Sequence, residues 1–133
     1  MKQITGRSDG MDIQVLLGKI IFDIEKIGDY ELLFSCSDGS RYRMFSSENG
    51  LGNDVEVYIE DICGKLESLI GTQITMAEKV TNRDDHPVKG HDEEERYIWT
   101  YYKLATAKGY VTIRWFGTSN GYYCEEAEFE LIE

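Results

Sequence analysis

Residues 96–116, RYIWTYYKLATAKGYVTIRWF, decide the fold class because two alternating runs of apolar and polar side chains lie on either side of Lys108-Gly109. Successive side chains of a strand point to opposite faces, so such runs are typical of strands. Asn120-Gly121 is a second turn signal, and an alternating acidic segment follows it. The spacing predicts a three-stranded antiparallel meander at the C-terminus.

The same alternation extends upstream through four shorter segments. Asp38-Gly39 separates two of them and predicts a hairpin, since a type I′ turn needs positive φ at both central residues. The predicted inward faces are Ile20, Phe22 and Ile24; Leu32, Phe34 and Cys36; Tyr42 and Met44; and Val55, Val57 and Ile59. In the meander, Val111, Ile113 and Trp115 form one face of the middle strand, and Tyr110, Thr112, Arg114 and Phe116 form the other.

One stretch has helical spacing instead: Ile62, Leu66, Leu69 and Ile70 recur every three or four residues, and Gly71 is placed to end a helix. We therefore predict an α+β domain dominated by antiparallel β-sheet, with seven to eight strands and one short helix near 62–70. Residues 1–10 form a loose lead-in and residues 11–133 the single domain. No repeating βα units are present, which argues against a doubly wound nucleotide-binding fold.

The composition excludes several classes of partner. With 14 basic and 25 acidic residues the net charge is −11, so direct binding to nucleic acid or anionic lipid is disfavoured and a protein with a basic surface is the natural partner. The three cysteines, Cys36, Cys63 and Cys124, include no CxxC pair, and their odd number and wide spacing do not resemble a disulfide framework. No apolar run approaches the length of a membrane span. We expect a cytoplasmic protein.

Both histidines and the only proline lie in residues 83–96, RDDHPVKGHDEEER. No register of this segment matches an EF-hand calcium loop. A divalent cation such as zinc, held by His86, His91 and Asp84, is one alternative. A solvated loop is another, because exposed carboxylates repel one another only weakly in water.

A third interpretation of this segment is an acidic surface that occupies the nucleic-acid-binding site of a basic protein. Glu126, Glu128 and Glu130 are alternate residues of the last strand, so neighbouring members of this row are about 6.6–6.8 Å apart. This spacing is close to that of two successive phosphate steps along a nucleic-acid strand, at about 3.4 Å each. The outer face of a sheet that simply faces water explains the same alternation. The candidate partner-binding residues are Asp84, Asp85, Asp92, Glu93, Glu94, Glu95, Glu126, Glu128 and Glu130.

No catalytic motif is present, so we expect no enzymatic activity and no required cofactor. Cys63 heads the predicted helix, where the helix dipole would lower the pKa of a thiol, but a small buried side chain is the simpler interpretation. Tyr97, Trp99 and Tyr101 share one strand face and form either core or a binding platform. A small-ligand pocket around Trp99, Tyr101 and Trp115 is a further alternative.

Two long stretches carry a resemblance: VYIEDICGKLESLIGTQITMAEKVTN and YIWTYYKLATAKGYVTIRWFGTSNGYY. With their YIED-x-x-G-x-L-x-x-LIG and KGYVTIRW…SNGYY signatures, they resemble an uncharacterised domain family of bacteria and their phages. The resemblance implies a phage or mobile-element setting and no defined activity. Together with the charge, it leads us to expect a non-enzymatic, acidic protein-binding module, for example an inhibitor of a host nucleic-acid-binding protein in the anti-restriction or anti-CRISPR style. Metal binding and small-ligand sequestration are the alternatives.

Overall fold

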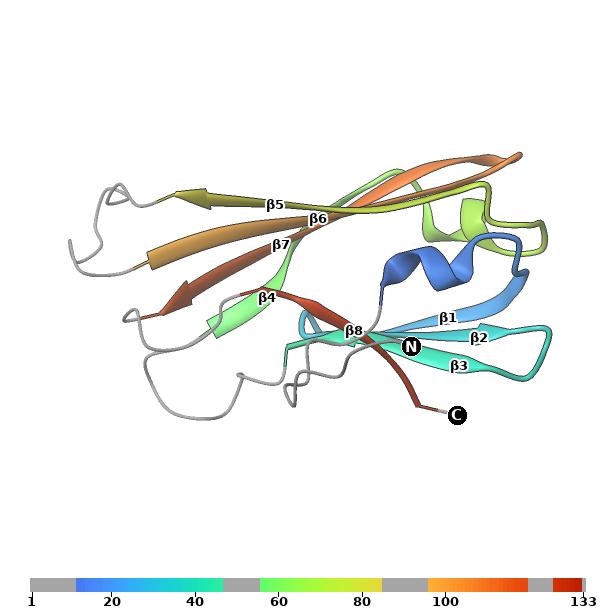
Figure 1. Cartoon of the computed structure of the whole chain (residues 1–133), viewed down its shortest axis with the longest axis horizontal. Coiled ribbons are helices and arrows are strands. Elements are labelled where there is room, and N and C mark those ends of the chain that lie inside the picture. The colour runs from blue at the N-terminus through green and yellow to red at the C-terminus, as the bar shows by residue number, and fades with distance from the viewer. Residues whose placement is uncertain (1–11, 47–55, 85–95, 120–125, 133) are drawn as a thin grey trace, which may run out of the picture.

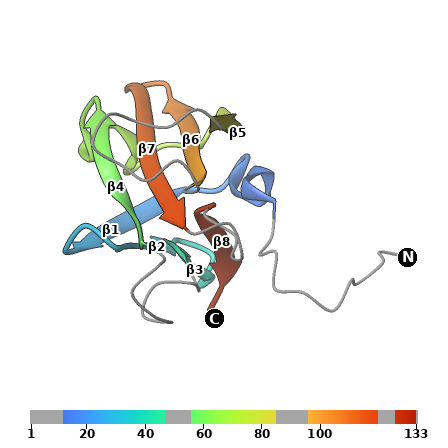
Figure 2. The same ribbon diagram turned by 90° about the vertical axis from the view of Figure 1, so that its left-hand side faces the viewer.

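The computed structural model describes residues 12–46, 56–84, 96–119 and 126–132, which form two four-stranded antiparallel sheets packed face to face (Figures 1 and 2). The short sheet has the order β1-β2-β3-β8 and the long sheet the order β4-β7-β6-β5. The strands are β1 (Ile21–Ile27), β2 (Glu31–Cys36), β3 (Arg41–Phe45), β4 (Glu56–Cys63), β5 (Met76–Asp84), β6 (Arg96–Thr106), β7 (Gly109–Ser119) and β8 (Glu128–Leu131). The prediction of a domain dominated by antiparallel sheet is confirmed.

The hydrophobic core lies between the two sheets. The predicted inward faces of β2 and β3 are buried, and so are Val111, Ile113 and Trp115 of β7. The Tyr102 hydroxyl donates to the Ala127 carbonyl at 3.2 Å and so links the long sheet to the residues that lead into β8. Each strand therefore contributes alternate side chains to one shared core, and this is why buried residues recur at every second position along the strands.

The C-terminal meander is only partly confirmed. The β6–β7 hairpin forms with Trp99 opposite Phe116. The predicted third strand is also present as β8, but its predicted place beside β7 is wrong, because β8 pairs with β3 in the short sheet. Phe129 explains the crossing: its ring packs against Tyr42 and Phe34 of the short sheet, at centroid distances of 5.2 and 5.9 Å. The meander of the long sheet consists of β5, β6 and β7 instead.

The helix predicted near 62–70 is reduced to a single 3-10 turn, η2 (Leu66–Leu69). β4 continues through Ile62, which pairs with Ile113, so the first part of the predicted helix belongs to the sheet. Gly71 has a φ of +97° and ends the turn as the sequence predicts. A second 3-10 turn, η1 (Ile13–Leu16), lies beside the start of β5 and was not predicted.

Two local predictions in the short sheet need correction. Phe22 is 60% exposed, because the register shifts between Ile21 and Asp23 and the bulged residue no longer points into the core. The hairpin at Asp38-Gly39 is present, but only Gly39 has positive φ, at +93°. This combination is typical of a type I turn followed by a left-handed residue, not of a type I′ turn.

Candidate functional site

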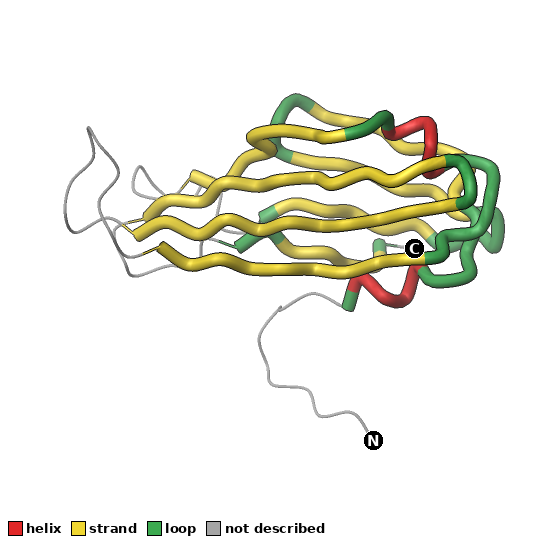
Figure 3. The backbone as a smooth tube through the Cα atoms, turned by 90° about the horizontal axis from the view of Figure 1, so that it is seen from above, coloured by secondary structure: helices red, strands yellow, loops and turns green. Residues whose placement is uncertain are grey.

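The outer face of the long sheet, turned toward the viewer in Figure 3, carries an aromatic patch formed by Tyr58, Trp99 and Phe116. These residues are cross-strand neighbours on β4, β6 and β7, with Phe116 of β7 in the middle. The Phe116 ring centroid lies 4.5 Å from that of Trp99 and 5.9 Å from that of Tyr58. All three side chains are half-buried, so the rings cover one another and still meet solvent.

A second cross-strand row extends the patch toward the edge of the sheet. It contains Arg114, Tyr101 and Val80 in register on β7, β6 and β5. Val80 is 41% exposed although it is apolar. The Arg114 guanidinium lies over the Trp99 ring, 5.5 Å from its centroid, and so joins the two rows through a cation–π contact.

The charge of Arg114 is offset locally by two carboxylates. Its Nε donates to Glu60 Oε1 at 2.7 Å, and Asp61 lies 3.9 Å from Nη2. The hydrogen bond to Glu60 is the main reason that the pKa of Arg114 is raised. Since two carboxylates face one guanidinium, this corner of the aromatic patch has a local charge of about −1 and does not attract phosphate.

The three aromatic residues predicted on β6 share a face as expected but differ in burial. Tyr97 is fully buried, whereas Trp99 and Tyr101 are half-buried. Trp115 lies in the core on the opposite face of the sheet. The predicted pocket around Trp99, Tyr101 and Trp115 is therefore wrong, because the hairpin register places Phe116, not Trp115, opposite Trp99.

The acidic row predicted on the last strand is not an exposed row. Glu128 is only 7% exposed. Glu126 accepts a hydrogen bond from Lys79 at 2.8 Å, and Glu130 accepts one from Arg43 at 2.7 Å. The prediction of three carboxylates facing water is wrong for Glu128, because β8 crosses to the short sheet and lies against β3.

Most of the acidic segment lies outside the described residues. His86, His91, Asp85, Asp92 and Glu93–Glu95 belong to this part, and the side chain of Asp84 is not described. Within the described ranges no group of three or more His, Cys, Asp and Glu residues is arranged to hold a metal ion.

The described cysteines differ in their surroundings. Cys63 is exposed at the end of β4 and not at the head of a helix, so its predicted position is wrong. Cys36 is buried in the core, and burial raises the pKa of its thiol. Neither described thiol lies in a group of metal-binding type.

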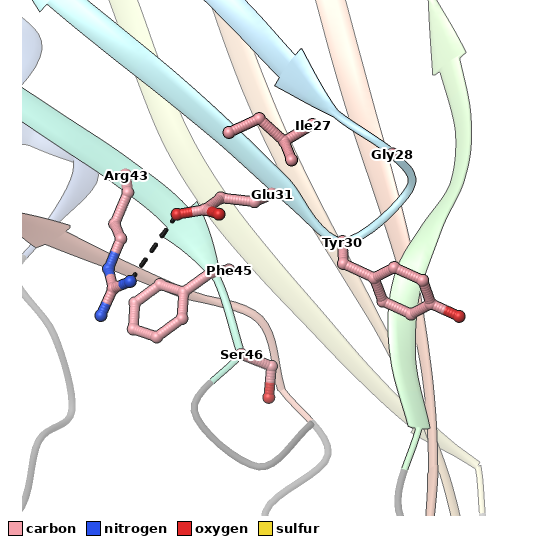
Figure 4. Close-up of a pocket in the computed structure, with 7 residues that line it drawn as sticks. All are labelled: Ile27, Gly28, Tyr30, Glu31, Arg43, Phe45 and Ser46. Atoms are coloured by element: carbon pink, nitrogen blue, oxygen red, sulfur yellow. Dashed lines mark ion pairs between the residues drawn. The ribbon is translucent and has the colours of Figure 1, made fainter. Parts of the chain in front are cut away.

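An open pocket of about 340 Å³ lies at the end of the short sheet, between the β1–β2 turn and the end of β3 (Figure 4). Its walls include Ile27, Tyr30 and Phe45, and its polar groups include Glu31 and Arg43. Figure 4 shows Arg43 beside both Glu31 and Phe45, while the Tyr30 ring lies toward β4. This pocket was not predicted, since its residues come from three strands and one turn.

The aromatic patch was also not predicted as a unit, although part of its signal was present. Trp99 and Phe116 lie on the same side of any hairpin with a tight two-residue turn between β6 and β7, because paired residues point to one face. Tyr58 could not be added, since β4 and β7 are far apart in the sequence and pair only in the folded protein.

Comparisons with known proteins agree with the resemblance found in the sequence at the level of an uncharacterised family. No curated protein and no solved structure matches the chain. Among the described residues, no helix has the length and apolar character required to cross a membrane. One family model matches residues 14–129, which include parts of both sheets and most of the chain. The chain therefore belongs to the family described as Domain of unknown function (DUF7448).

Proposed function

We propose that the protein is a non-enzymatic binding module that holds a protein partner against the aromatic patch. The observation that carries this proposal is the position of Tyr58, Trp99 and Phe116 on the outer face of the long sheet, whose core residues point the other way. Aromatic side chains supply much of the energy of protein interfaces. Contiguous apolar surface of this kind is typical of an interaction site.

The chemistry around the patch favours a basic partner. Glu60 and Asp61 outnumber Arg114 at one corner, and Glu56 lies beside the patch on β4. The sequence between β5 and β6, which lies outside the described residues, contains further carboxylates. An aromatic centre with an acidic rim would attract a basic protein over a distance and then bury apolar area at contact.

The partner class follows from this charge and from the phage or mobile-element setting implied by the sequence resemblance. Host proteins that bind nucleic acid present basic surfaces, because phosphate binding requires them. We infer that a surface of this kind is the target and that binding blocks its use. Occupation of the site is sufficient for this function, so no bond-breaking step is needed.

The proposal is tested by affinity capture from a lysate of the native host, with wild-type protein and two variants. Trp99→Ala removes the largest ring of the aromatic patch, which lies beside the central Phe116. Phe22→Ala is the matched control, because Phe22 is an exposed aromatic residue on the short sheet. We expect one protein to be enriched by wild type and Phe22→Ala. Its capture by Trp99→Ala should fall about thirty-fold, as for the loss of an interface residue worth about 2 kcal/mol.

Salt provides the second measurement. Because the rim is acidic, capture should weaken between about 0.05 M and 0.5 M salt, over which the screening length shortens severalfold. Thermal melting of each variant establishes that it is folded. A partner that binds Trp99→Ala as well as wild type, or that ignores ionic strength, would contradict the proposal.

A further inference from the structure

The pocket on the short sheet is a second site, separate from the aromatic patch. Leu32 and Met44 point into the core, so their neighbours Glu31 and Phe45 lie on the outer face of this sheet. Ile27 pairs with Glu31 and lies on the same side. We propose that this pocket binds the side chain of a basic residue, lysine or arginine, from a protein partner.

The size of the pocket limits what it can hold. Its volume of about 340 Å³ is near the lower end of the range of about 300–1,000 Å³ found for small-molecule sites. One long side chain fits such a volume, whereas a dinucleotide or a folded element does not. The pocket is open to solvent, which suits a side chain that enters from a partner's surface.

The walls suit the methylene stem of a basic side chain. Ile27 is 42% exposed although it is large and apolar. Phe45 also lines the pocket. The stems of lysine and arginine cover apolar surface of this kind while their charged heads remain near water or a carboxylate.

The polar groups select a cation over an anion. Arg43 is already engaged, because its Nε donates to Glu130 at 2.7 Å and its guanidinium lies 3.8 Å from the centroid of the Phe45 ring. Two carboxylates, Glu31 and Glu130, face this one guanidinium. The local charge is therefore about −1, and an anionic ligand would be repelled.

Glu31 is the group that would receive the incoming cation. Within the described part of the chain its only ion pair is with Arg43, and the separation of 3.6 Å between Nη1 and Oε2 is too long for a hydrogen bond. The carboxylate thus keeps its capacity to accept hydrogen bonds at the pocket. An ammonium or guanidinium placed there would form a charge-assisted hydrogen bond next to an apolar wall.

The test is a titration of the isotopically labelled full chain, followed by amide NMR spectra. The probes are N-acetyl-arginine methylamide and N-acetyl-lysine methylamide, with the norleucine and glutamate analogues as neutral and anionic controls. We expect saturable shifts with the basic probes at the amides of residues 27–31 and 43–46. The neutral probe should bind at least about ten-fold more weakly, as for the loss of one charge-assisted hydrogen bond, and the anionic probe should not bind.

A pair of variants then assigns the shifts to the proposed carboxylate. Glu31→Gln should weaken binding of the basic probes about ten-fold, whereas Glu25→Gln should leave it unchanged. Glu25 provides the same charge change on the neighbouring strand β1, outside the pocket lining. Absence of saturable shifts, equal binding of the norleucine probe, or equal loss in both variants would overturn the inference. These results are independent of Trp99, so they separate this site from the proposed function.

Discussion

Replacement of Gly64 by alanine tests the packing of the long sheet most directly. Gly64 follows the last residue of β4 and has a φ of +100°. A Cβ at this position would lie 2.5 Å from the main-chain oxygen of Tyr110 and 3.3 Å from Cα of Val111. Both contacts are with the backbone of β7, which cannot rotate away as a side chain can.

The expected cost has two parts. Positive φ costs a non-glycine residue about 1–2 kcal/mol. Forcing a methyl group into a closed backbone contact costs about 1–3 kcal/mol more, as in an overpacked core. We therefore expect Gly64→Ala to lower the free energy of unfolding by about 2–5 kcal/mol, a large fraction of the total for a domain of this size.

Gly39→Ala is the matched control. Gly39 has a similar φ of +93°, but among the described residues no heavy atom beyond its two chain neighbours lies within 4 Å of the position that a Cβ would occupy there. Gly39→Ala should therefore lower the free energy of unfolding only by the cost of positive φ, about 1–2 kcal/mol. In urea unfolding followed by circular dichroism, a difference of about 2 kcal/mol between the variants corresponds to a midpoint difference of about 1 M. Equal midpoints would refute the close approach of β7 to Gly64.

Three further outcomes are expected. Tyr102→Phe should destabilise the protein by about 1–2 kcal/mol in the same urea assay, because it removes a buried hydrogen bond between the long sheet and the segment that leads into β8. Asp38→Asn should be destabilising at pH 7, since the hydrogen bond from Lys19 holds the pKa of Asp38 below its usual range. The stabilisation is fully present above about pH 4 and is lost as the pH falls through the lowered pKa, so the two stability curves should converge in acid. In a Cys124→Ser variant, a thiol reagent should label Cys63 in the native protein, because Cys63 is exposed, and should label the buried Cys36 only on unfolding.

Local alternation predicted much of the fold. Alternation predicts Leu32, Phe34 and Met44 on inward faces, and all three are buried. This succeeds because the two-residue period is a property of each strand by itself. Phe22 is an exception to this alternation, because a bulge in β1 places it on the surface.

Pairing between distant strands could not be predicted in the same way. The alternation of β8 is identical whether the strand pairs with β7 or with β3. The sequence pattern of β8 therefore does not indicate that it pairs with β3 in the short sheet, where Glu128 is buried. The packing of Phe129 against Tyr42 decides between the two arrangements. Those residues are far apart in the sequence, and their contact exists only after both sheets have formed.

The sequence by itself determined that this is an acidic, antiparallel sheet protein and that Trp99 and Trp115 occupy paired strands. It could not determine which of the two meets solvent, because both faces of the β6–β7 hairpin are rich in apolar and aromatic side chains. The tertiary structure decided this by packing the short sheet against the face that carries Trp115. The physical reason is that a strand fixes which side chains share a face, whereas burial depends on which face another sheet covers.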